Sequence, residues 1–336
     1  MIEKRTGKVD EKVGRREMMA AGAGLVAGMS AAGRAGASEV RSPGAERQPG
    51  RPASRESGHF ILGLNTSTLR GHKLSLVEEI EIAAKAGYRG LEPWVSELEQ
   101  HAAAGKSLEN VGKQLRDAGI SVESAIGFFE WIVDDEGRRR KALETARRNM
   151  ALVRKIGGKR LAAPPVGATN TPMPDLLRVA ERYRALLEIG DEMGVVPEVE
   201  VWGFSKTLGR LGEAALVAIE AHHPAACILP DVYHLHRGGS DFEGVKLLSP
   251  RAIHVFHFND YLRSPAREQL TDEHRVFPGD GIAPLKALVR DLDEGGFDVM
   301  LSLELFNRQY WKMDPLTVAR TGFEKMEALV QSVLGR

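Results

Sequence analysis

Residues 175–202 have the sequence DLLRVAERYRALLEIGDEMGVVPEVEVW, and this stretch decides the fold. Apolar residues recur at helical spacing as far as Met193, which predicts a helix over 175–193. Gly194 follows, where a helix commonly ends in the left-handed backbone that glycine adopts without strain. Residues 197–202 form a short apolar run interrupted by acidic side chains, which predicts a buried strand. The stretch therefore predicts one helix followed by one strand.

The same unit recurs on both sides of this stretch, from Phe60 onward. Expected strands cover residues 60–65, 90–94, 121–127, 160–164, 197–202, 227–231, 252–258 and 299–305. Expected helices cover residues 74–86, 107–118, 138–156, 175–193, 207–221, 284–294 and 316–334. After the sixth strand, residues 236–240 are rich in glycine and only 242–248 have helical spacing. Eight strands over residues 58–336 give about 35 residues per unit, the size typical of a (β/α)₈ barrel.

A doubly wound open sheet is the competing α/β fold. It favours a glycine-rich phosphate-binding turn after the first strand, whereas this chain has Asn65-Thr-Ser-Thr68 there. Glycines that end a helix shortly before a strand recur along the chain instead, at Gly87, Gly119, Gly157, Gly194 and Gly296. We therefore expect a closed (β/α)₈ TIM barrel that occupies residues 58–336.

The N-terminal region differs from the rest of the chain. The pair Arg15-Arg16 precedes a mildly apolar stretch, residues 20–32, and then Ala35-Gly-Ala37, a small-x-small cleavage pattern. These parts in this order resemble a twin-arginine export signal, which predicts a signal peptide over 1–37 and a periplasmic or otherwise exported protein. The apolar stretch is too short to span a bilayer, so we expect no stable membrane insertion after signal removal. Residues 38–57 are rich in Pro, Gly, Ser and Arg, which predicts a disordered linker.

The composition excludes several classes of protein. Of the 336 residues, 43% are apolar and 27% are charged, and the formal net charge is zero. This balance gives no electrostatic reason to expect a nucleic-acid partner. Cys227 is the single cysteine, which excludes an internal disulfide framework and a cysteine-rich metal site. The length suits one large domain or two ordinary ones, and association into a homo-oligomer stays open.

Four consecutive strands end in a side chain that can bind a metal, and these are Glu200, Asp231, His257 and Glu304. Catalytic groups of a TIM barrel lie at the C-terminal ends of its strands, so we expect the four to converge. Converging carboxylates repel one another unless a cation lies between them. Three carboxylates and one imidazole suit Mn²⁺, Mg²⁺, Co²⁺ or Zn²⁺. Glu200 is favoured over Glu198 because it lies nearer its strand's end, and strand parity favours His257 over His254.

Local motifs around these residues resemble the xylose-isomerase-like TIM-barrel superfamily, often labelled sugar phosphate isomerase/epimerase. They are Glu200-Val-Trp-Gly203, Asp231-x-x-His234, His257-Phe-Asn-Asp260, Leu303-Glu-Leu-Phe-Asn307 and Arg275-Val-Phe-Pro-Gly-Asp-Gly281. The resemblance covers the chain from about Phe60 to the C-terminus. In the family's ketose 3-epimerases and inosose-dehydratase-like relatives the matching Glu, Asp, His and Glu bind one metal. The resemblance thus implies one divalent ion held by the four strand-end residues.

The resemblance also implies a reaction, the isomerisation or epimerisation of a small-molecule sugar or keto-sugar through an enediolate. The ion would polarise the carbonyl. Glu200 and Glu304, besides binding the ion, would act as an acid–base pair that removes and returns a proton. His234 would bind a substrate oxygen, and Arg275 would stabilise negative charge or a hydroxyl. Glu92 ends the second strand at a family position near the substrate, with a structural hydrogen bond as the alternative role.

Other functions stay open. A lyase or dehydratase acting on an oxidised sugar or inositol would use the same metal and enediolate chemistry. Export favours an unphosphorylated substrate, since sugar phosphates are mainly intracellular. A non-catalytic sugar-binding barrel is a third candidate, although a binder needs neither an acid nor a base. A related three-zinc DNA-repair endonuclease requires extra histidines at the second and third strand ends, where this chain has Glu92-Pro-Trp94 and Ala125-Ile-Gly127.

Overall fold

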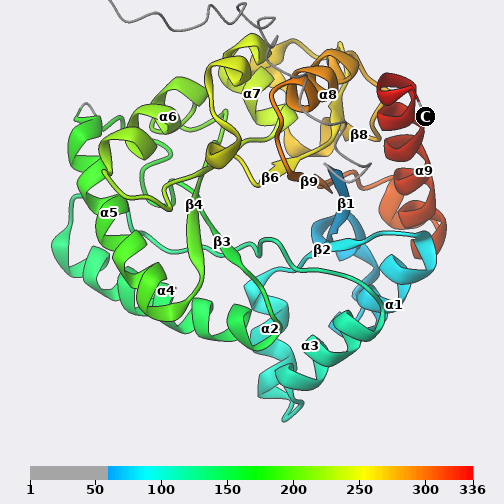
Figure 1. Cartoon of the computed structure of the whole chain (residues 1–336), viewed down its shortest axis with the longest axis horizontal. Coiled ribbons are helices and arrows are strands. Elements are labelled where there is room, and N and C mark those ends of the chain that lie inside the picture. The colour runs from blue at the N-terminus through cyan, green and yellow to red at the C-terminus, as the bar shows by residue number, and fades with distance from the viewer. Residues whose placement is uncertain (1–59, 174, 336) are drawn as a thin grey trace, which may run out of the picture. The chain divides into compact units, whose positions relative to one another are not determined.

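The computed structural model describes residues 60–173 and 175–335. The expected signal peptide (1–37) and linker (38–57) lie outside these residues. Within the described part, strands and helices alternate along the chain, and parallel strands form a closed barrel surrounded by helices (Figure 1). The predicted (β/α)₈ TIM-barrel fold is thereby confirmed.

Two parallel sheets joined edge to edge make the barrel. Their strand orders are β2-β1-β9-β6 and β3-β4-β5. The strands are β1 (Phe60–Asn65), β2 (Gly90–Glu92), β3 (Arg160–Ala163), β4 (Val196–Glu200), β5 (Ile228–Leu229), β6 (Val255–His257) and β9 (Val299–Leu303). Isolated bridges join β5 to β6, from Ile228 to Ile253 and from Asp231 to His257. A separate antiparallel pair, β7 (Asp260–Tyr261) and β8 (Arg275–Val276), follows β6.

The third barrel position is filled by a segment that is not a regular strand. A continuous strand is predicted over 121–127, whereas only Ser121 and Ile126 form bridges to the β2 side. Backbone hydrogen bonds of Ala125, at 2.9 and 3.2 Å, join the segment to β3 on its other side. On this side Lys159 N also donates to Val122 O at 3.2 Å, and Lys159 Nζ pairs with Glu123 at 2.7 Å. The eight-strand period is kept, but one position departs from regular pairing.

Helices cover the outside of the barrel (Figure 1). They are α1 (Leu76–Ala86), α2 (Val95–Ala103), α3 (Leu108–Asp117), α4 (Glu136–Lys155), α5 (Leu176–Met193), α6 (Leu211–Glu220), α7 (Val232–Gly238), α8 (Leu285–Glu294) and α9 (Pro315–Leu334). Helices α2 and α7 are absent from the prediction. In α2 only Val95 and Leu98 are buried, so its sequence lacks a strong apolar stripe. Residues Phe242–Leu247 form a 3₁₀ helix rather than an α-helix.

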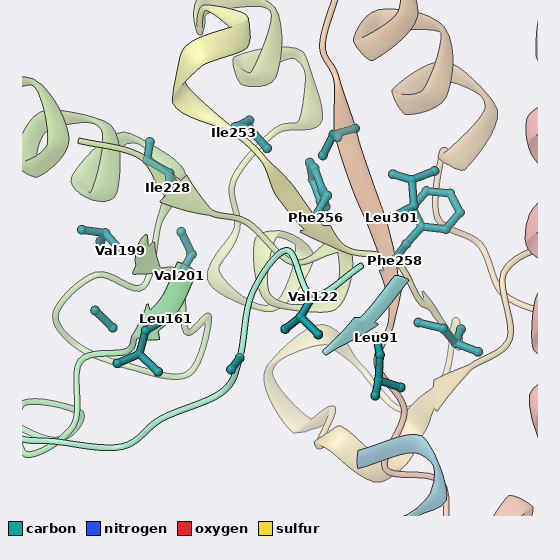
Figure 2. Close-up of a cluster of buried hydrophobic side chains, with 14 of the residues drawn as sticks. Leu91, Val122, Leu161, Val199, Val201, Ile228, Ile253, Phe256, Phe258 and Leu301 are labelled. Atoms are coloured by element: carbon teal, nitrogen blue, oxygen red, sulfur yellow. The ribbon is translucent and has the colours of Figure 1, made fainter. Parts of the chain in front are cut away.

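Alternate strand residues face either the helices or the barrel interior. The layer between strands and helices includes the buried side chains Leu91, Val199, Phe256 and Leu301 (Figure 2). The smaller interior cluster consists of Ile126, Ala162, Leu229, Val255 and Met300. Two residues beyond Leu229 lies Asp231, and two residues beyond Val255 lies His257. The inward face of each strand therefore changes from apolar to polar toward its C-terminal end.

Met300 fills the interior below these polar residues. A Cβ atom on Gly63 would lie 2.6 Å from Met300 Sδ, and one on Gly90 would lie still closer. Only glycine leaves room for the methionine at these two positions. Apolar packing thus closes the lower part of the barrel and confines the polar groups to its C-terminal end.

Local signals fix the helix ends as the sequence predicts. Ser75 forms a capping box with Glu78 at the start of α1, and Gly87 ends that helix at a φ of 108°. Gly194 ends α5 in the same left-handed region, at a φ of 69°. Over the residues that the structure describes, no helix is long and apolar enough to cross a membrane.

Candidate metal centre

The four predicted ligands lie together at the C-terminal ends of the barrel strands. Glu200 is the last residue of β4 and His257 the last residue of β6. Asp231 follows β5 and caps α7, where its side chain accepts a hydrogen bond from His234 N at 2.8 Å. Glu304 directly follows β9. Consecutive inward positions on neighbouring strands thus bring three carboxylates and one imidazole to one place.

The Nδ1 atom of His257 faces all three carboxylates. It lies 3.2 Å from Glu304 Oε2, 3.4 Å from Asp231 Oδ2 and 4.0 Å from Glu200 Oε1. One ligand atom each from Asp231, His257 and Glu304 lies within 4.8 Å of the others, the spacing of a metal-binding group. Glu200 stands slightly apart from this triad, on the cavity side.

The hydrogen bonding of these residues fits a bound cation. His257 Nδ1 and Glu200 Oε2 are buried without a hydrogen-bond partner among the described residues. Such orphaned polar groups are costly unless something else binds them. An imidazole nitrogen and carboxylate oxygens are donors that Mn²⁺, Mg²⁺, Co²⁺ and Zn²⁺ accept. The residues therefore fit one divalent ion.

Arg275 supplies positive charge inside the carboxylate cluster. Its Nη1 lies 2.6 Å from Asp231 Oδ2 and 2.7 Å from Glu304 Oε2, and the side chain is buried. Its Nη2 reaches Asp272 Oδ1 at 2.8 Å and His234 Nε2 at 3.1 Å. Desolvation opposes ionisation of Asp231, but the charge of Arg275 outweighs it and holds the pKa of that carboxyl well below its usual range.

Glu92 lies on the far side of the imidazole. Its Oε2 is 3.2 Å from His257 Nε2, and it accepts hydrogen bonds from Ser302 Oγ at 2.6 Å and Asn65 Nδ2 at 2.9 Å. The residue is fully buried and does not line the cavity, although the sequence placed it near the substrate. A carboxylate on the distal nitrogen of a metal-binding histidine fixes the ring's tautomer and orientation.

Burial and mutual charge shift the pKa values at this site. Desolvation disfavours the charged imidazole, but the carboxylates of Glu304 and Glu92 outweigh it and raise the pKa of His257 well above its ordinary value. Desolvation raises the pKa of Glu200 to about 8. Burial lowers the pKa of His234 to about 4, so this ring is neutral at pH 7. Perturbed groups of both kinds in one cluster are typical of functional sites.

A cavity of about 200 Å³ opens above the cluster. Its polar lining comes from Glu200, His234, Asp272, Arg275 and Glu304. Its aromatic lining comes from Trp94, Phe128, Trp202, Phe204 and Phe306. Phe128 and Phe204 are 43% and 44% exposed, which is high for phenylalanine beside a buried centre. The cavity therefore joins a polar base to apolar walls that suit the C–H faces of a small polyhydroxylated ring.

A family model described as a xylose isomerase-like TIM barrel matches residues 80–329. The chain belongs to this family. The inosose isomerase of Bacillus velezensis is 26% identical over 261 residues, which cover 76% of this chain and 92% of that protein. The 3-dehydroshikimate dehydratase of Pseudomonas putida is 24% identical over 69% of this chain and 36% of its own length. These relatives are enzymes that act on small sugar-like molecules.

A solved structure of similar fold carries a metal. It is the IolI protein with a bound zinc atom, with a TM-score of 0.74 and 22% identity over 81% of this chain and 99% of that one. In this chain, Asp231, His257 and Glu304 form a buried triad with the spacing of a metal-binding group.

Several residues around the site escaped sequence reasoning. Glu92 accepts hydrogen bonds from Asn65 and Ser302, and Arg275 donates one to Asp272. Each of these three partners is a polar residue of a common type. Asn65 and Ser302 lie on inward strand positions near a C-terminal end, and this parity was the signal that could have found them. Asp272 lies in a loop, where no such periodicity exists.

Proposed function

We propose that this protein is a divalent-metal-dependent isomerase or epimerase of a sugar or keto-sugar, acting through an enediolate. The observation that supports it most is the unpartnered Nδ1 of His257, surrounded by the carboxylates of Glu200, Asp231 and Glu304 at a cavity base. These four residues would hold the ion. When bound, it would supply Lewis-acid polarisation of a substrate carbonyl.

Glu200 and Glu304 are the proposed acid–base pair. Both line the cavity, and they come from strands β4 and β9, with β5 and β6 between them in the barrel. Carboxylates that approach one substrate carbon from different sides can remove a proton and return it on the other face. His234, neutral at pH 7, would bind a substrate oxygen, and Arg275 would stabilise developing negative charge.

The cavity supports an unphosphorylated substrate. Among the described residues that line it, Arg275 is the one cationic side chain, and its nitrogens already contact Asp231, Glu304 and Asp272. A phosphate dianion at the base of the cavity would lie beside several carboxylates, and the one cation that lines the cavity is already paired with them. From the Arg15-Arg16 segment we infer that the protein is exported. Export also favours an unphosphorylated substrate, because sugar phosphates are mainly intracellular. Fractionation of cells that express the full chain tests that location.

A metal-dependent dehydratase is the second candidate. The relative from Pseudomonas putida supports it, since that protein is a 3-dehydroshikimate dehydratase. The same residues would remove a proton beside a carbonyl, and loss of a β-hydroxyl as water would follow instead of reprotonation. A non-catalytic sugar-binding barrel leaves the paired glutamates at the cavity without a role.

Metal content and proton exchange test the proposal together. We expect one divalent ion per chain by elemental analysis, and metal-dependent exchange of a substrate C–H proton with deuterated water. NMR on a panel of keto-sugars and inososes reports the exchange. Formation of a product that has lost water separates a dehydratase from an epimerase. A protein that binds no stoichiometric ion after reconstitution with Mn²⁺, Co²⁺ or Zn²⁺ would contradict the proposed function.

A further inference from the structure

Arg70 is held near the cavity by a well-anchored segment. It belongs to the 3₁₀ helix Thr66–His72, which follows β1 at the barrel end that carries the metal centre. Thr68 Oγ1 donates to Leu303 O at 2.8 Å and accepts from Leu305 N at 3.1 Å. These two backbone groups flank Glu304, so the segment is fastened to the strand end that bears a proposed catalytic residue.

The guanidinium of Arg70 lies over aromatic rings of the cavity wall. Its Cζ is 3.5 Å from the centroid of the Trp94 ring and 5.6 Å from that of Phe306, and both rings line the cavity. A guanidinium stacked on an aromatic face keeps its N–H edge available for hydrogen bonds. Desolvation lowers the pKa of Arg70 and the charges of Glu97 and Glu304 oppose it, which places Arg70 within the electrostatic reach of the metal centre.

Arg70 has no ion-pair partner among residues 60–173 and 175–335. The acids that act on it are otherwise engaged. Glu97 accepts hydrogen bonds from Thr66 Oγ1 and from Trp94 N. Burial raises the pKa of Glu79 to about 9, so that carboxyl is neutral at pH 7. Arg275, by contrast, is already paired with carboxylates. Arg70 is therefore an exposed cation against the cavity wall, without an ion pair among the described residues.

We propose that Arg70 binds a carboxylate of the substrate while the metal centre binds the reacting oxygens, so the preferred substrates are carboxylated keto-polyols. One guanidinium matches one carboxylate, because its two parallel N–H groups reach both oxygens. The Trp94 ring beneath fixes the plane in which these donors lie. The inference rests on the proposed function, because the carboxylate and the reacting carbons belong to one molecule.

The alternative is that Arg70 only covers the face of Trp94. Arg70→Met separates the two roles, because methionine keeps an apolar stem over the ring and removes the charge. Arg308→Met is the matched control, since Arg308 pairs with Glu273 at 2.7 Å and its side chain is 70% exposed. The probes are 3-dehydroshikimate, its uncharged methyl ester and a neutral inosose. Quenching of tryptophan fluorescence on the full, Mn²⁺-loaded chain reports their Kd at pH 7.

We expect the wild-type protein to bind the acid more tightly than the ester. Arg70→Met should raise the Kd of the acid by about 10-fold to 100-fold and that of the ester by less than about 2-fold. Arg308→Met should change neither. Equal weakening of acid and ester by Arg70→Met, or equal affinity of both for the wild-type protein, overturns the proposal. Absence of saturable acid binding at millimolar concentration also overturns it.

The outcome is distinguishable from a failure of the proposed function. Metal stoichiometry and metal-dependent proton exchange on neutral inososes do not require Arg70. A protein that passes those tests and shows no preference for the acid keeps its proposed function and lacks the carboxylate site. A protein that binds the acid through Arg70 but exchanges no proton has the site without the reaction.

Discussion

Glu92 Oε2 lies 3.2 Å from His257 Nε2, on the opposite side of the ring from the nitrogen that faces the other three ligands. With Nε2 protonated and directed at Glu92, Nδ1 carries the lone pair that a metal requires. Ser302 and Asn65 hold the Glu92 carboxylate by hydrogen bonds at 2.6 and 2.9 Å. The ring orientation is thus set by residues that do not touch the cavity.

Glu92→Gln should weaken metal binding by about 10-fold to 100-fold, because the amide no longer stabilises the ring tautomer as a charged acceptor does. Competition against a fluorescent chelator measures the change in Kd for Zn²⁺. Glu123→Gln is the control, since Glu123 is also buried but pairs with Lys159 at 2.7 Å, away from the four metal ligands. Equal metal affinity in Glu92→Gln and wild type would contradict the orienting role.

Glu200→Gln and Glu304→Gln should each lower the rate of proton exchange by about 100-fold to 10,000-fold, since each removes a general acid or base. Single-turnover exchange in deuterated water, with metal content checked for every variant, measures the change. Glu198→Gln is the matched control on the same strand. Glu198 is fully buried and does not line the cavity, so its amide should keep the rate. Full turnover by both Glu200→Gln and Glu304→Gln would exclude the two-glutamate scheme.

Local features made the barrel predictable. Gly87 and Gly194 each end a helix before a strand, and inward parity selected His257 on β6. The contacts of Arg275 could not be found this way. It reaches Asp231, 44 residues away, because the short β7–β8 pair sets Arg275 beside Tyr261. No hydrophobic period marks strands of two residues, so the partner of Arg275 depends on tertiary structure.

The lack of a hydrophobic period also explains why other parts of the structure could not be predicted from the sequence. Helix α7 has the sequence VYHLHRG, too short and too polar to show a helical period. Asp260 accepts hydrogen bonds from Gly279 N, Gly281 N and Ala283 N at 2.8–3.0 Å. The carboxylate oxygens of Asp260 thus stabilise the Pro-Gly-Asp-Gly turn. Such loop contacts leave no periodic trace in the sequence.

Glu79→Gln should stabilise the protein more at pH 8 than at pH 5. Desolvation, with the nearby charge of Glu97, raises the folded-state pKa of Glu79 to about 9 from an ordinary value of 4.5. The folded state therefore favours the protonated form. The contribution of protonated Glu79 to the free energy of unfolding is fully present below about pH 4.5 and is lost as pH rises toward 9. Thermal unfolding at both pH values measures it, and an equal change in Tm at pH 5 and pH 8 would contradict this reading.

Gly203→Ala should destabilise the site and the fold. A Cβ atom there would overlap the carbonyl oxygen of His234 and the backbone nitrogen of Gly238, both in α7. Backbone cannot yield as a flexible side chain does, so we expect a loss of about 1–3 kcal/mol or more. Gly212→Ala is the control in α6, where an added Cβ meets nothing within 4 Å and alanine favours the helix. Urea unfolding should separate the two, and equal stabilities would argue against this packing.

Removal of the ion with EDTA should lower Tm. An ion that binds only the folded state at 100 times its Kd stabilises it by about 2.7 kcal/mol, which corresponds to roughly 5–10 °C for a domain of this size. Scanning calorimetry with and without Mn²⁺ measures the shift. Asp231→Asn should shrink it, because it removes a charged ligand. An equal Tm with and without Mn²⁺ would argue against a contribution of the metal site to stability.

The four ligands divide evenly between the two sheets of the barrel. Glu200 and Asp231 extend from β4 and β5, whereas His257 and Glu304 extend from β6 and β9. Where β5 meets β6, isolated bridges replace a continuous ladder, and one of them joins Asp231 to His257. An ion held by all four residues would link the two sheets across this seam between β5 and β6. Opening of the seam and loosening of the coordination sphere would then be one motion, so a substrate that tightens the sphere would also draw the two halves of the barrel together.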